Sequence, residues 1–159
     1  MVKDNSNQKL SYSELLKKAQ KYCISQEKTV FQVTCKLKNW GASKETIEKV
    51  IQSLKKDDFI NEERFVSLFI KSKIKYNKWG KNKIIAALRF YKIEEDFIAN
   101  FDEFINLEFY IKVLENLIEK KAKELTKEKD EALKKQKIIS YCKSKGFETN
   151  IIFNILEKK

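Results

Sequence analysis

The most distinctive chemistry in this sequence is positive charge gathered in one segment. Thirty consecutive residues, Arg64 to Ile93, contain no Asp or Glu. The basic residues of this segment are Arg64, Lys71, Lys73, Lys75, Lys78, Lys81, Lys83, Arg89 and Lys92. They account for most of the formal net charge of +11. Because like charges repel one another and destabilise a compact chain, the segment predicts a polyanionic partner. The alternative is that these lysines only solvate a surface.

Aromatic residues are interleaved with these charges, at Phe65, Phe69, Tyr76, Trp79, Phe90 and Tyr91. Trp79 lies between Lys78 and Gly80, where a turn is expected. Its indole could stack on a base or insert into a protein pocket. It could equally cover the junction between two structural repeats, and the sequence leaves this choice open. For Trp40, beside Gly41, we expect a packing role.

A second possible chemistry comes from four acids just before the basic segment, Asp57, Asp58, Glu62 and Glu63. Such a cluster could hold magnesium and support a nuclease. However, Glu62 and Glu63 lie at a predicted helix start, where negative charge compensates the helix dipole. The chain also has no histidine, the commonest general base and zinc ligand. We therefore expect no enzyme activity, no metal and no cofactor.

The composition favours an all-α fold. Hydrophobic residues make up 42% of the chain, and there is no proline and only three glycines, the residues that punctuate β-rich chains. Cys23, Cys35 and Cys142 are expected to be small buried residues in a reducing compartment. No apolar stretch approaches the roughly 20 residues of a membrane span. The polar start, Met1 to Gln8, does not resemble a signal peptide. We expect a soluble cytoplasmic protein.

A helical pattern recurs three times along the chain with a period near 50 residues. The first occurrence is Val33, Leu37, Ala42, Ile47 and Val50; the second is Ile84, Leu88, Ile93, Ile98 and Phe101; the third is Ile138, Cys142, Phe147, Ile152 and Ile155. This periodicity predicts three tandem three-helix repeats, at 11–57, 58–105 and 106–159, after a flexible N-terminus at 1–10. Stacked repeats predict an elongated, curved monomer.

Local signals place the individual helices. Capping boxes are predicted at Ser11 with Glu14 and at Thr29 with Gln32, and further helix starts at Ser43 and Asn61. Gly41 is predicted to end a helix in a left-handed conformation. In the second repeat we expect helices at about 61–77, 81–91 and 94–104. In the third we expect a long helix at 107–125, a charged helical hairpin at 120–137 and a short helix through 151–155.

On the helix expected at 61–77, part of the charge falls on one face. Arg64, Lys71, Lys75 and Lys78 are spaced by seven, four and three residues, which places them in one stripe opposite the apolar side chains. Such a stripe can track a phosphate backbone or an acidic groove. Lys73 instead falls within the apolar arc, near Glu62 in angle. There it could form an ion pair or lie along the edge of the core.

The central block also resembles the RecX family of recombinase regulators. The resemblance is carried by the runs 58–65 (DFINEERF), 69–73 (FIKSK) and 79–84 (WGKNKI), followed by Leu88 and Arg89. The run 37–41 (LKNWG) is similar to the first repeat of that family. Two departures are that Lys81 replaces the usual proline after the glycine, and that lysines replace common arginines at Lys71, Lys73 and Lys83. Lysine keeps the charge but lacks the bidentate fork of arginine.

The resemblance implies a protein that binds RecA filaments on single-stranded DNA and restrains ATP hydrolysis, filament growth and strand exchange. The residues expected to contact RecA or DNA are Arg64, Lys71, Lys75, Lys78, Trp79, Lys81, Lys83 and Arg89. Single-stranded DNA would be contacted directly or through the filament. The alternative function is that of a basic helical DNA-binding protein with no recombinase partner.

Overall fold

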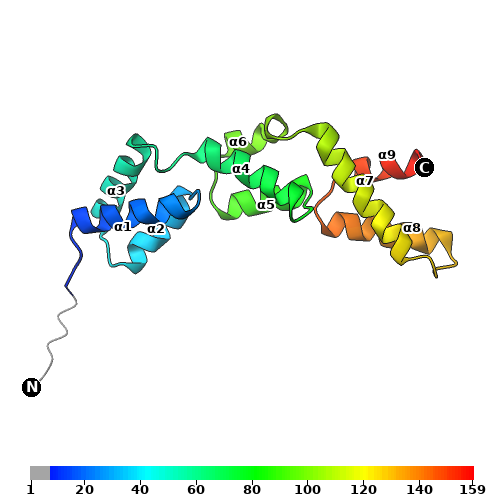
Figure 1. Ribbon diagram of the computed structural model, residues 1–159, viewed down its shortest axis with the longest axis horizontal. Helices are drawn as coiled ribbons and strands as arrows, with labels where there is room; N and C mark the ends of the chain where they lie inside the picture. The colour runs from blue at the N-terminus through cyan, green and yellow to red at the C-terminus, as the bar shows by residue number, and fades with distance from the viewer. Residues whose placement is uncertain (1–7) are drawn as a thin grey trace, which may run out of the picture. The chain divides into compact units, whose positions relative to one another are not determined.

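The computed structural model describes residues 8–159, and these residues form helices joined by short turns (Figure 1). The α-helices are α1 (Tyr12–Ser25), α2 (Val30–Asn39), α3 (Lys44–Lys56), α4 (Glu62–Lys75), α5 (Lys81–Phe90), α6 (Glu95–Ala99), α7 (Leu107–Glu124), α8 (Glu131–Ser144) and α9 (Thr149–Glu157), with a 3-10 helix, η1, at Phe101–Phe104. The all-α prediction is therefore confirmed. The flexible segment predicted at 1–10 lies mostly outside the described residues.

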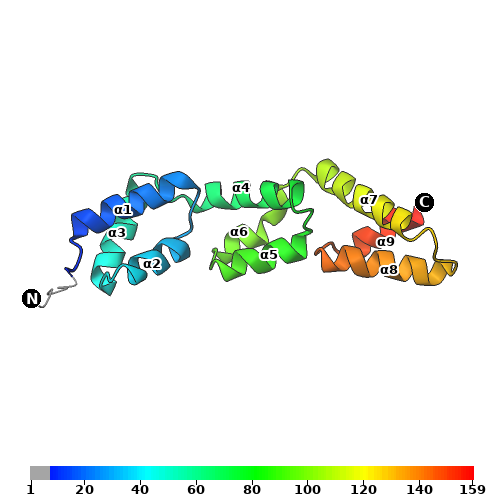
Figure 2. The ribbon, with the colours of Figure 1, turned by 60° about the horizontal axis from the view of Figure 1, so that its bottom comes forward.

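The chain divides into two compact units. Unit 1 ends at Phe65, and unit 2 comprises Val66–Lys159, so that the boundary falls within α4. Unit 1 contains α1, α2 and α3, and unit 2 contains most of α4 and all later helices, including the antiparallel pair α7 and α8 (Figure 2). The division into three repeats and the elongated shape stay predictions.

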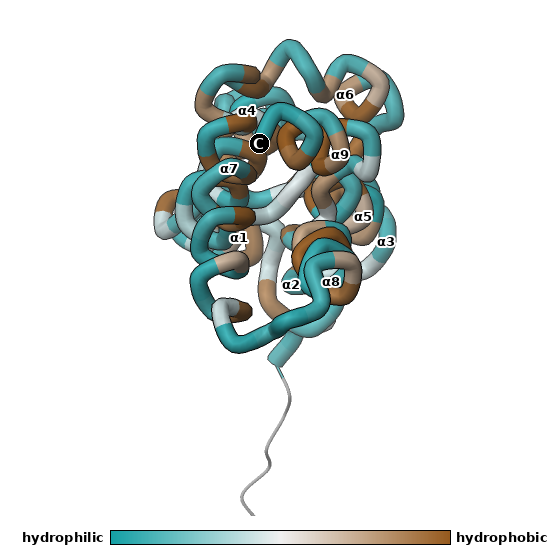
Figure 3. The backbone as a smooth tube through the Cα atoms, turned by 90° about the vertical axis from the view of Figure 1, so that its right-hand side faces the viewer, coloured by the Kyte–Doolittle hydropathy of each residue, from teal (hydrophilic) through white to brown (hydrophobic). Residues whose placement is uncertain are grey.

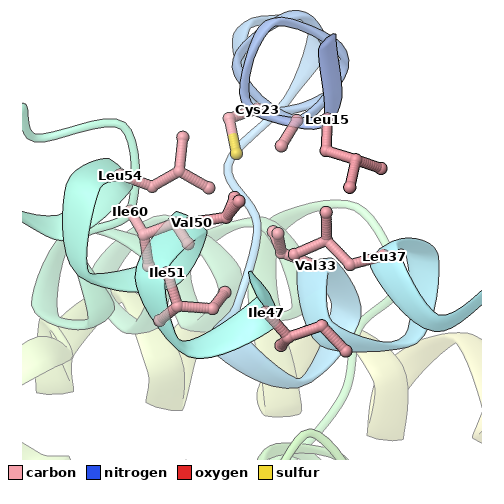
Figure 4. Close-up of a cluster of buried hydrophobic side chains, with 10 residues drawn as sticks. Leu15, Cys23, Val33, Leu37, Ile47, Val50, Ile51, Leu54 and Ile60 are labelled. Atoms are coloured by element: carbon pink, nitrogen blue, oxygen red, sulfur yellow. The ribbon is translucent and has the colours of Figure 1, made fainter. Parts of the chain in front are cut away.

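The core of unit 1 is a cluster of side chains from all three of its helices. Leu15 and Cys23 of α1 point toward Val33 of α2 and toward α3 (Figure 4). The buried members of this cluster are Leu15, Ala19, Cys23, Val33, Leu37, Ile47, Val50, Ile51, Leu54 and Ile60. Burial of such aliphatic side chains contributes about 1.5–3 kcal/mol each. The predicted core positions of the first repeat are thus brought together.

The helix starts follow the predicted caps. The Ser11 hydroxyl accepts a hydrogen bond from the Glu14 N–H, and the Glu14 carboxylate accepts one from the Ser11 N–H, at 3.2 and 2.8 Å. Thr29 and Gln32 form the same reciprocal pair at α2. Ser43 and Asn61 accept hydrogen bonds from the N–H groups three residues later. These short-range signals are confirmed at all four positions.

The second helix of each predicted repeat ends in the same backbone turn. Gly41, Lys92 and Gly146 have φ values of 81°, 56° and 96°. The next N–H then donates to the carbonyl five residues earlier, giving N···O distances of 3.0, 3.1 and 3.2 Å. This is the Schellman arrangement, in which a left-handed residue lets the chain reverse. Its recurrence at matching positions supports the three-repeat interpretation.

The side chains at the repeated positions are also buried to a similar extent. Of the fifteen residues in the three predicted sets, every one except Ala42 is buried, and Ala42 is partly buried. Figure 3 shows the alternation that produces this burial, with hydrophobic and hydrophilic stretches following one another along the helices. Each helix therefore turns one face inward and leaves another to solvent.

Three sequence-based predictions need correction. Helix α4 ends at Lys75 rather than Asn77, and Lys78 follows it with a φ of 56°, so Lys78 leaves the helical stripe. The predicted helix at 94–104 is a short α-helix followed by η1. Cys35 is exposed, although Cys23 and Cys142 are buried as expected. Since α2 buries Val33 and Leu37, the residue midway between them faces away from the core.

Candidate functional site

The free positive charge of α4 lies on its solvent face. Lys71 and Lys75 are both exposed, and no residue between 8 and 159 forms an ion pair with either of them. Leu68, one turn before Lys71 and two turns before Lys75, is 52% exposed and shares their face. Val66 and Ile70 are fully buried on the other side. The α4 face, defined as Leu68, Lys71 and Lys75, therefore combines two charges with an exposed aliphatic side chain.

Trp79 follows this helix and is flanked by two lysines. The Nζ atoms of Lys73 and Lys83 lie 4.8 and 4.9 Å from the centre of its indole ring. Lys73 also lies 5.2 Å from the ring centre of Phe69. Ammonium groups at these distances are attracted by the ring faces. Trp79 is half-buried, so both a packing role and a binding role are compatible with its position.

The suggested pairing of Lys73 with Glu62 is wrong. Both residues lie in α4, eleven positions apart. At a rise of about 1.5 Å per residue, this separates them by about 16 Å along the axis. Similar angles around a helix do not bring side chains together when they are three turns apart. Lys73 instead contacts aromatic rings at the C-terminal end.

Arg64 is engaged within unit 1. Its Nε donates to Glu27 at 2.6 Å, and its Nη1 and Nη2 donate to the Asp58 side chain and main-chain carbonyl, each at 2.9 Å. The hydrogen bond to Glu27 raises the pKa of Arg64. Hydrogen bonds from Asn61 and then Arg64 lower the pKa of Asp58. Arg64 therefore ties the start of α4 to the α1–α2 connection instead of adding to the open charge.

Two further predicted contact residues are also neutralised locally. Lys81 Nζ lies 2.8 Å from Asp102, and Arg89 makes a two-pronged contact with Glu95 at 3.0 and 3.3 Å. The ammonium group of Lys78 donates to the carbonyl of Lys75 at 2.5 Å. Of the eight predicted contact residues, Lys71, Lys75, Lys78 and the Trp79–Lys83 pair thus form no ion pair within residues 8–159, although the Lys78 ammonium group is held by the helix end.

The turn that carries Trp79 is held by the C-terminal end of α8. Gly80 and Asn82 donate their N–H groups to the carbonyls of Lys145 and Gly146 at 2.8 and 2.9 Å. A Cβ atom added to Gly80 would lie 2.3 Å from the Phe147 nitrogen. The two backbones can approach this closely only because a glycine lies at the contact.

Tyr110 of α7 completes this junction. Its hydroxyl accepts a hydrogen bond from the Lys81 N–H at 2.9 Å and donates to Glu148 at 2.5 Å. Burial is the main cause that raises the pKa of Tyr110, and the Glu148 hydrogen bond adds to it. Tyr110 itself is buried, and the sequence gives no sign of these hydrogen bonds. Its partners lie 29 and 38 residues away, so no local signal could reveal them.

The acidic residues considered for a metal are used differently. Asp58 pairs with Arg64, while Glu62 and Glu63 occupy the first turn of α4, where they favour the helix dipole. Among residues 8–159, no group of three or more His, Cys, Asp or Glu side chains is arranged to hold a metal ion.

Comparison with known proteins gives evidence of relatedness, which the geometry alone does not provide. No family model matches the chain. It is 32% identical over 137 residues to the Regulatory protein RecX of Clostridium acetobutylicum, an alignment that covers 82% of this chain and 62% of that protein. It is 30% identical over 141 residues to the Regulatory protein RecX of Clostridium tetani, covering 88% and 64%. The chain belongs to the RecX family. The resemblance seen in the sequence is thereby confirmed.

Solved RecX structures share the fold. The crystal structure of RecX from Lactobacillus salivarius superposes with a TM-score of 0.85 at 21% identity, covering 92% of this chain and 95% of that one. A second RecX crystal structure gives a TM-score of 0.79 at 20% identity, covering 91% and 74%. At these identities the likeness shows the fold alone. The chain spans 62% and 64% of the two clostridial RecX proteins.

The length and hydropathy of the described helices bear on whether they could cross a membrane. None of the helices between residues 8 and 159 combines the length and the apolar character that a membrane span requires.

Proposed function

We propose that this RecX family chain is a regulatory binding protein that acts on RecA filaments assembled on single-stranded DNA. In this proposal it restrains ATP hydrolysis, filament growth and strand exchange, with no catalytic chemistry of its own. Family membership supports a regulatory role, and the acid-free basic segment supports a polyanionic or acidic partner.

The observation that carries the proposal is the composition of the α4 face. A surface that only tracks phosphates gains nothing from an exposed leucine, because phosphates and sugars offer it little apolar area. Leu68 is 52% exposed and lies one turn before Lys71 on the same helix face. Apolar anchors surrounded by charge are typical of protein interfaces. The α4 face therefore favours an acidic protein groove with an apolar patch.

The second candidate function is DNA binding with no recombinase partner. It is favoured by Trp79 with Lys73 and Lys83, since a half-buried ring between ammonium groups suits a nucleotide. The two functions predict different effects of the same substitutions.

The first test is charge reversal on the α4 face. Lys71→Glu with Lys75→Glu should abolish inhibition of DNA-stimulated ATP hydrolysis by the cognate RecA, because attraction becomes repulsion. The melting temperature should barely change, since exposed substitutions usually shift stability by about 0.5 kcal/mol or less. The matched control is Lys120→Glu with Lys123→Glu, two exposed lysines of α7 in the same unit. A folded α4 variant that still inhibits like the control would place the functional surface elsewhere.

The second test separates protein contact from phosphate contact. Leu68→Ala should weaken filament binding while leaving its salt dependence unchanged, because no charge is lost. If Lys71 and Lys75 contact single-strand phosphates, each Lys→Ala change should lower the salt slope of log affinity by about 0.7. Binding that is indifferent to Leu68→Ala but follows this slope would favour plain DNA binding.

A further inference from the structure

A second lysine-rich region lies in unit 1, outside the basic segment considered above. Between Leu15 and Lys44 the chain has one acidic residue, Glu27, and seven lysines: Lys17, Lys18, Lys21, Lys28, Lys36, Lys38 and Lys44. Glu27 is already bound by Arg64 at 2.6 Å. The α1–α2 part of unit 1 therefore carries positive charge that no acid of its own sequence balances.

Several of these lysines gather around two aromatic rings, forming what we call the Tyr22–Trp40 corner. The rings of Tyr22 in α1 and Trp40 at the end of α2 meet edge to face, with centroids 6.5 Å apart and an interplanar angle of 81°. Lys18 lies 4.6 Å from the Trp40 ring centre. Lys28 and Lys36 lie 4.6 and 5.4 Å from the Tyr22 ring centre. Three ammonium groups from two helices and their connection thus surround one pair of rings.

Lys28 is the least expected member of the corner. It is only 8% exposed, yet no carboxylate among residues 8–159 forms an ion pair with it. Within the described part of the chain, its ammonium group contacts the Tyr22 ring and the side-chain oxygen of Gln26, at 3.4 Å. A buried charge is costly without an opposite charge, and a ring face compensates only part of that cost. A bound anion would supply the missing charge.

The same corner recurs in the second predicted repeat. The repeat offset of 51 residues relates Lys18, Tyr22 and Trp40 to Phe69, Lys73 and Tyr91. There, Phe69 and Tyr91 meet edge to face at 5.8 Å and 82°, and Lys73 lies 5.2 Å from the Phe69 ring centre. Each corner contains two rings and a lysine. In the first repeat the lysine precedes the ring (Lys18 and Tyr22), whereas at the matching positions of the second repeat the ring precedes the lysine (Phe69 and Lys73). The corner is thus a repeated feature of this chain and not a single accident of packing.

We propose that the Tyr22–Trp40 corner of unit 1 binds single-stranded nucleic acid, with Lys18, Lys28 and Lys36 on phosphate and the Trp40 ring against a base. Half-buried rings give a base a stacking surface, and the exposed lysines, Lys18 and Lys36, can move from the ring faces to the strand. An acidic peptide would satisfy the lysines but would leave the ring surface unused. The proposal goes beyond the filament-binding function, because it concerns unit 1 and needs no recombinase.

The test uses free strands and a single indole reporter. The chain has two tryptophans, so Trp79→Phe leaves Trp40 as the only one. In that background, titration with a deoxythymidine oligomer should quench the Trp40 fluorescence. Adding Lys18→Ala with Lys36→Ala should weaken binding and lower the salt slope of log affinity by about 1.4, from two lost phosphate contacts. The matched control is Lys55→Ala with Lys56→Ala, exposed lysines of α3 that change the net charge equally.

Quenching by the oligomer but not by inorganic polyphosphate supports stacking at Trp40. Equal binding by the corner variant and the control would overturn the proposal, and so would the absence of quenching. Polyglutamate that binds as tightly as the oligomer and competes with it would identify a protein-binding surface instead. Because these measurements contain no RecA, failure of the filament-binding function in the ATP hydrolysis assay would leave their result unchanged.

Discussion

At the scale of single residues, the positive charges of this chain separate into paired and open groups. Arg64, Lys81 and Arg89 each contact a carboxylate, whereas Lys71 and Lys75 contact none in the described part of the chain. Paired side chains hold local structure, and open ones are available to a partner. The same residue type therefore serves stability at one position and recognition at another.

Replacing Arg64 should accordingly affect folding. In Arg64→Ala, Glu27 loses its guanidinium partner, and the Glu27 Oε2 atom already lies buried with no hydrogen bond from residues 8–159. We expect a loss of about 1 kcal/mol in the free energy of unfolding, a value reduced by the partial exposure of the pair. Denaturant unfolding measures it, with Lys71→Ala as an exposed control. A variant as stable as the control would show that the ion pair contributes nothing.

The three cysteines should differ sharply in reactivity. Burial raises the pKa of Cys23, and it raises the pKa of Cys142 to about 11, so both remain thiols at neutral pH. Cys35 is exposed on α2. Since the thiolate is the reactive form and needs access, a thiol reagent should modify one group quickly in the native protein and three after denaturation. The fast phase should disappear in Cys35→Ala; its persistence would contradict the burial of the other two.

Which of these residue-level features could be predicted depends on separation along the chain. The capping pairs at Ser11 and Thr29 follow from residues three apart, so the sequence predicts them correctly. The bond between Arg64 and Glu27 joins residues 37 apart, and nothing local indicates it. The angular stripe therefore grouped Arg64 with Lys71, although only tertiary structure determines which of the two is already paired.

At the scale of elements, the junction between α5 and α8 makes a prediction about glycine. A Cβ on Gly146 would lie 2.4 Å from the Lys83 Cβ and 2.6 Å from its nitrogen, at a φ of 96°. Gly41 has a φ of 81° but no atom within 4 Å of such a Cβ. Gly41→Ala should therefore cost only the left-handed conformation, about 1–2 kcal/mol. Gly146→Ala adds an overlap of about 1–3 kcal/mol to that strain.

Thermal and denaturant unfolding of the two glycine variants provides the comparison. Equal losses for Gly41→Ala and Gly146→Ala would mean that the α5–α8 contact is looser than its distances indicate. A Gly80→Ala variant offers a second check without positive φ, since its added Cβ would meet the Phe147 nitrogen at 2.3 Å.

The ends of elements were harder to predict than their existence. Gly41 is a sequence signal for its turn, because glycine tolerates a left-handed conformation. Lys92 makes the same turn without that signal. Lys78 likewise takes a φ of 56°, which ends α4 two residues earlier than its apolar spacing predicts. Main-chain hydrogen bonds close both turns, from the Ile93 N–H to the Leu88 carbonyl and from the Trp79 N–H to the Lys73 carbonyl, and residue propensity alone misplaces the boundary.

At the scale of the whole molecule, the repeat pattern and the compact units describe different properties. The three Schellman turns follow the sequence period of about 50 residues. The two units instead reflect where the chain contacts itself: the second and third predicted repeats share one unit through Gly80, Tyr110 and Gly146. A period in the sequence predicts similar modules, but it does not predict which neighbouring modules pack against one another.

This division predicts that the two units lose structure separately. Trp40 reports on unit 1 and Trp79 on unit 2, so Trp79→Phe and Trp40→Phe variants allow each unit to be followed by fluorescence. Gly146→Ala strains only the α5–α8 junction, which lies wholly within unit 2. It should therefore lower the unfolding midpoint seen by Trp79 while that seen by Trp40 stays nearly constant. Leu37→Ala removes a fully buried side chain from the core of unit 1. It should lower the unfolding midpoint seen by Trp40 while that seen by Trp79 stays nearly constant. If either substitution shifts both midpoints equally, then α4 couples the units into one cooperative structure, because it is the only helix that crosses their boundary among the described residues.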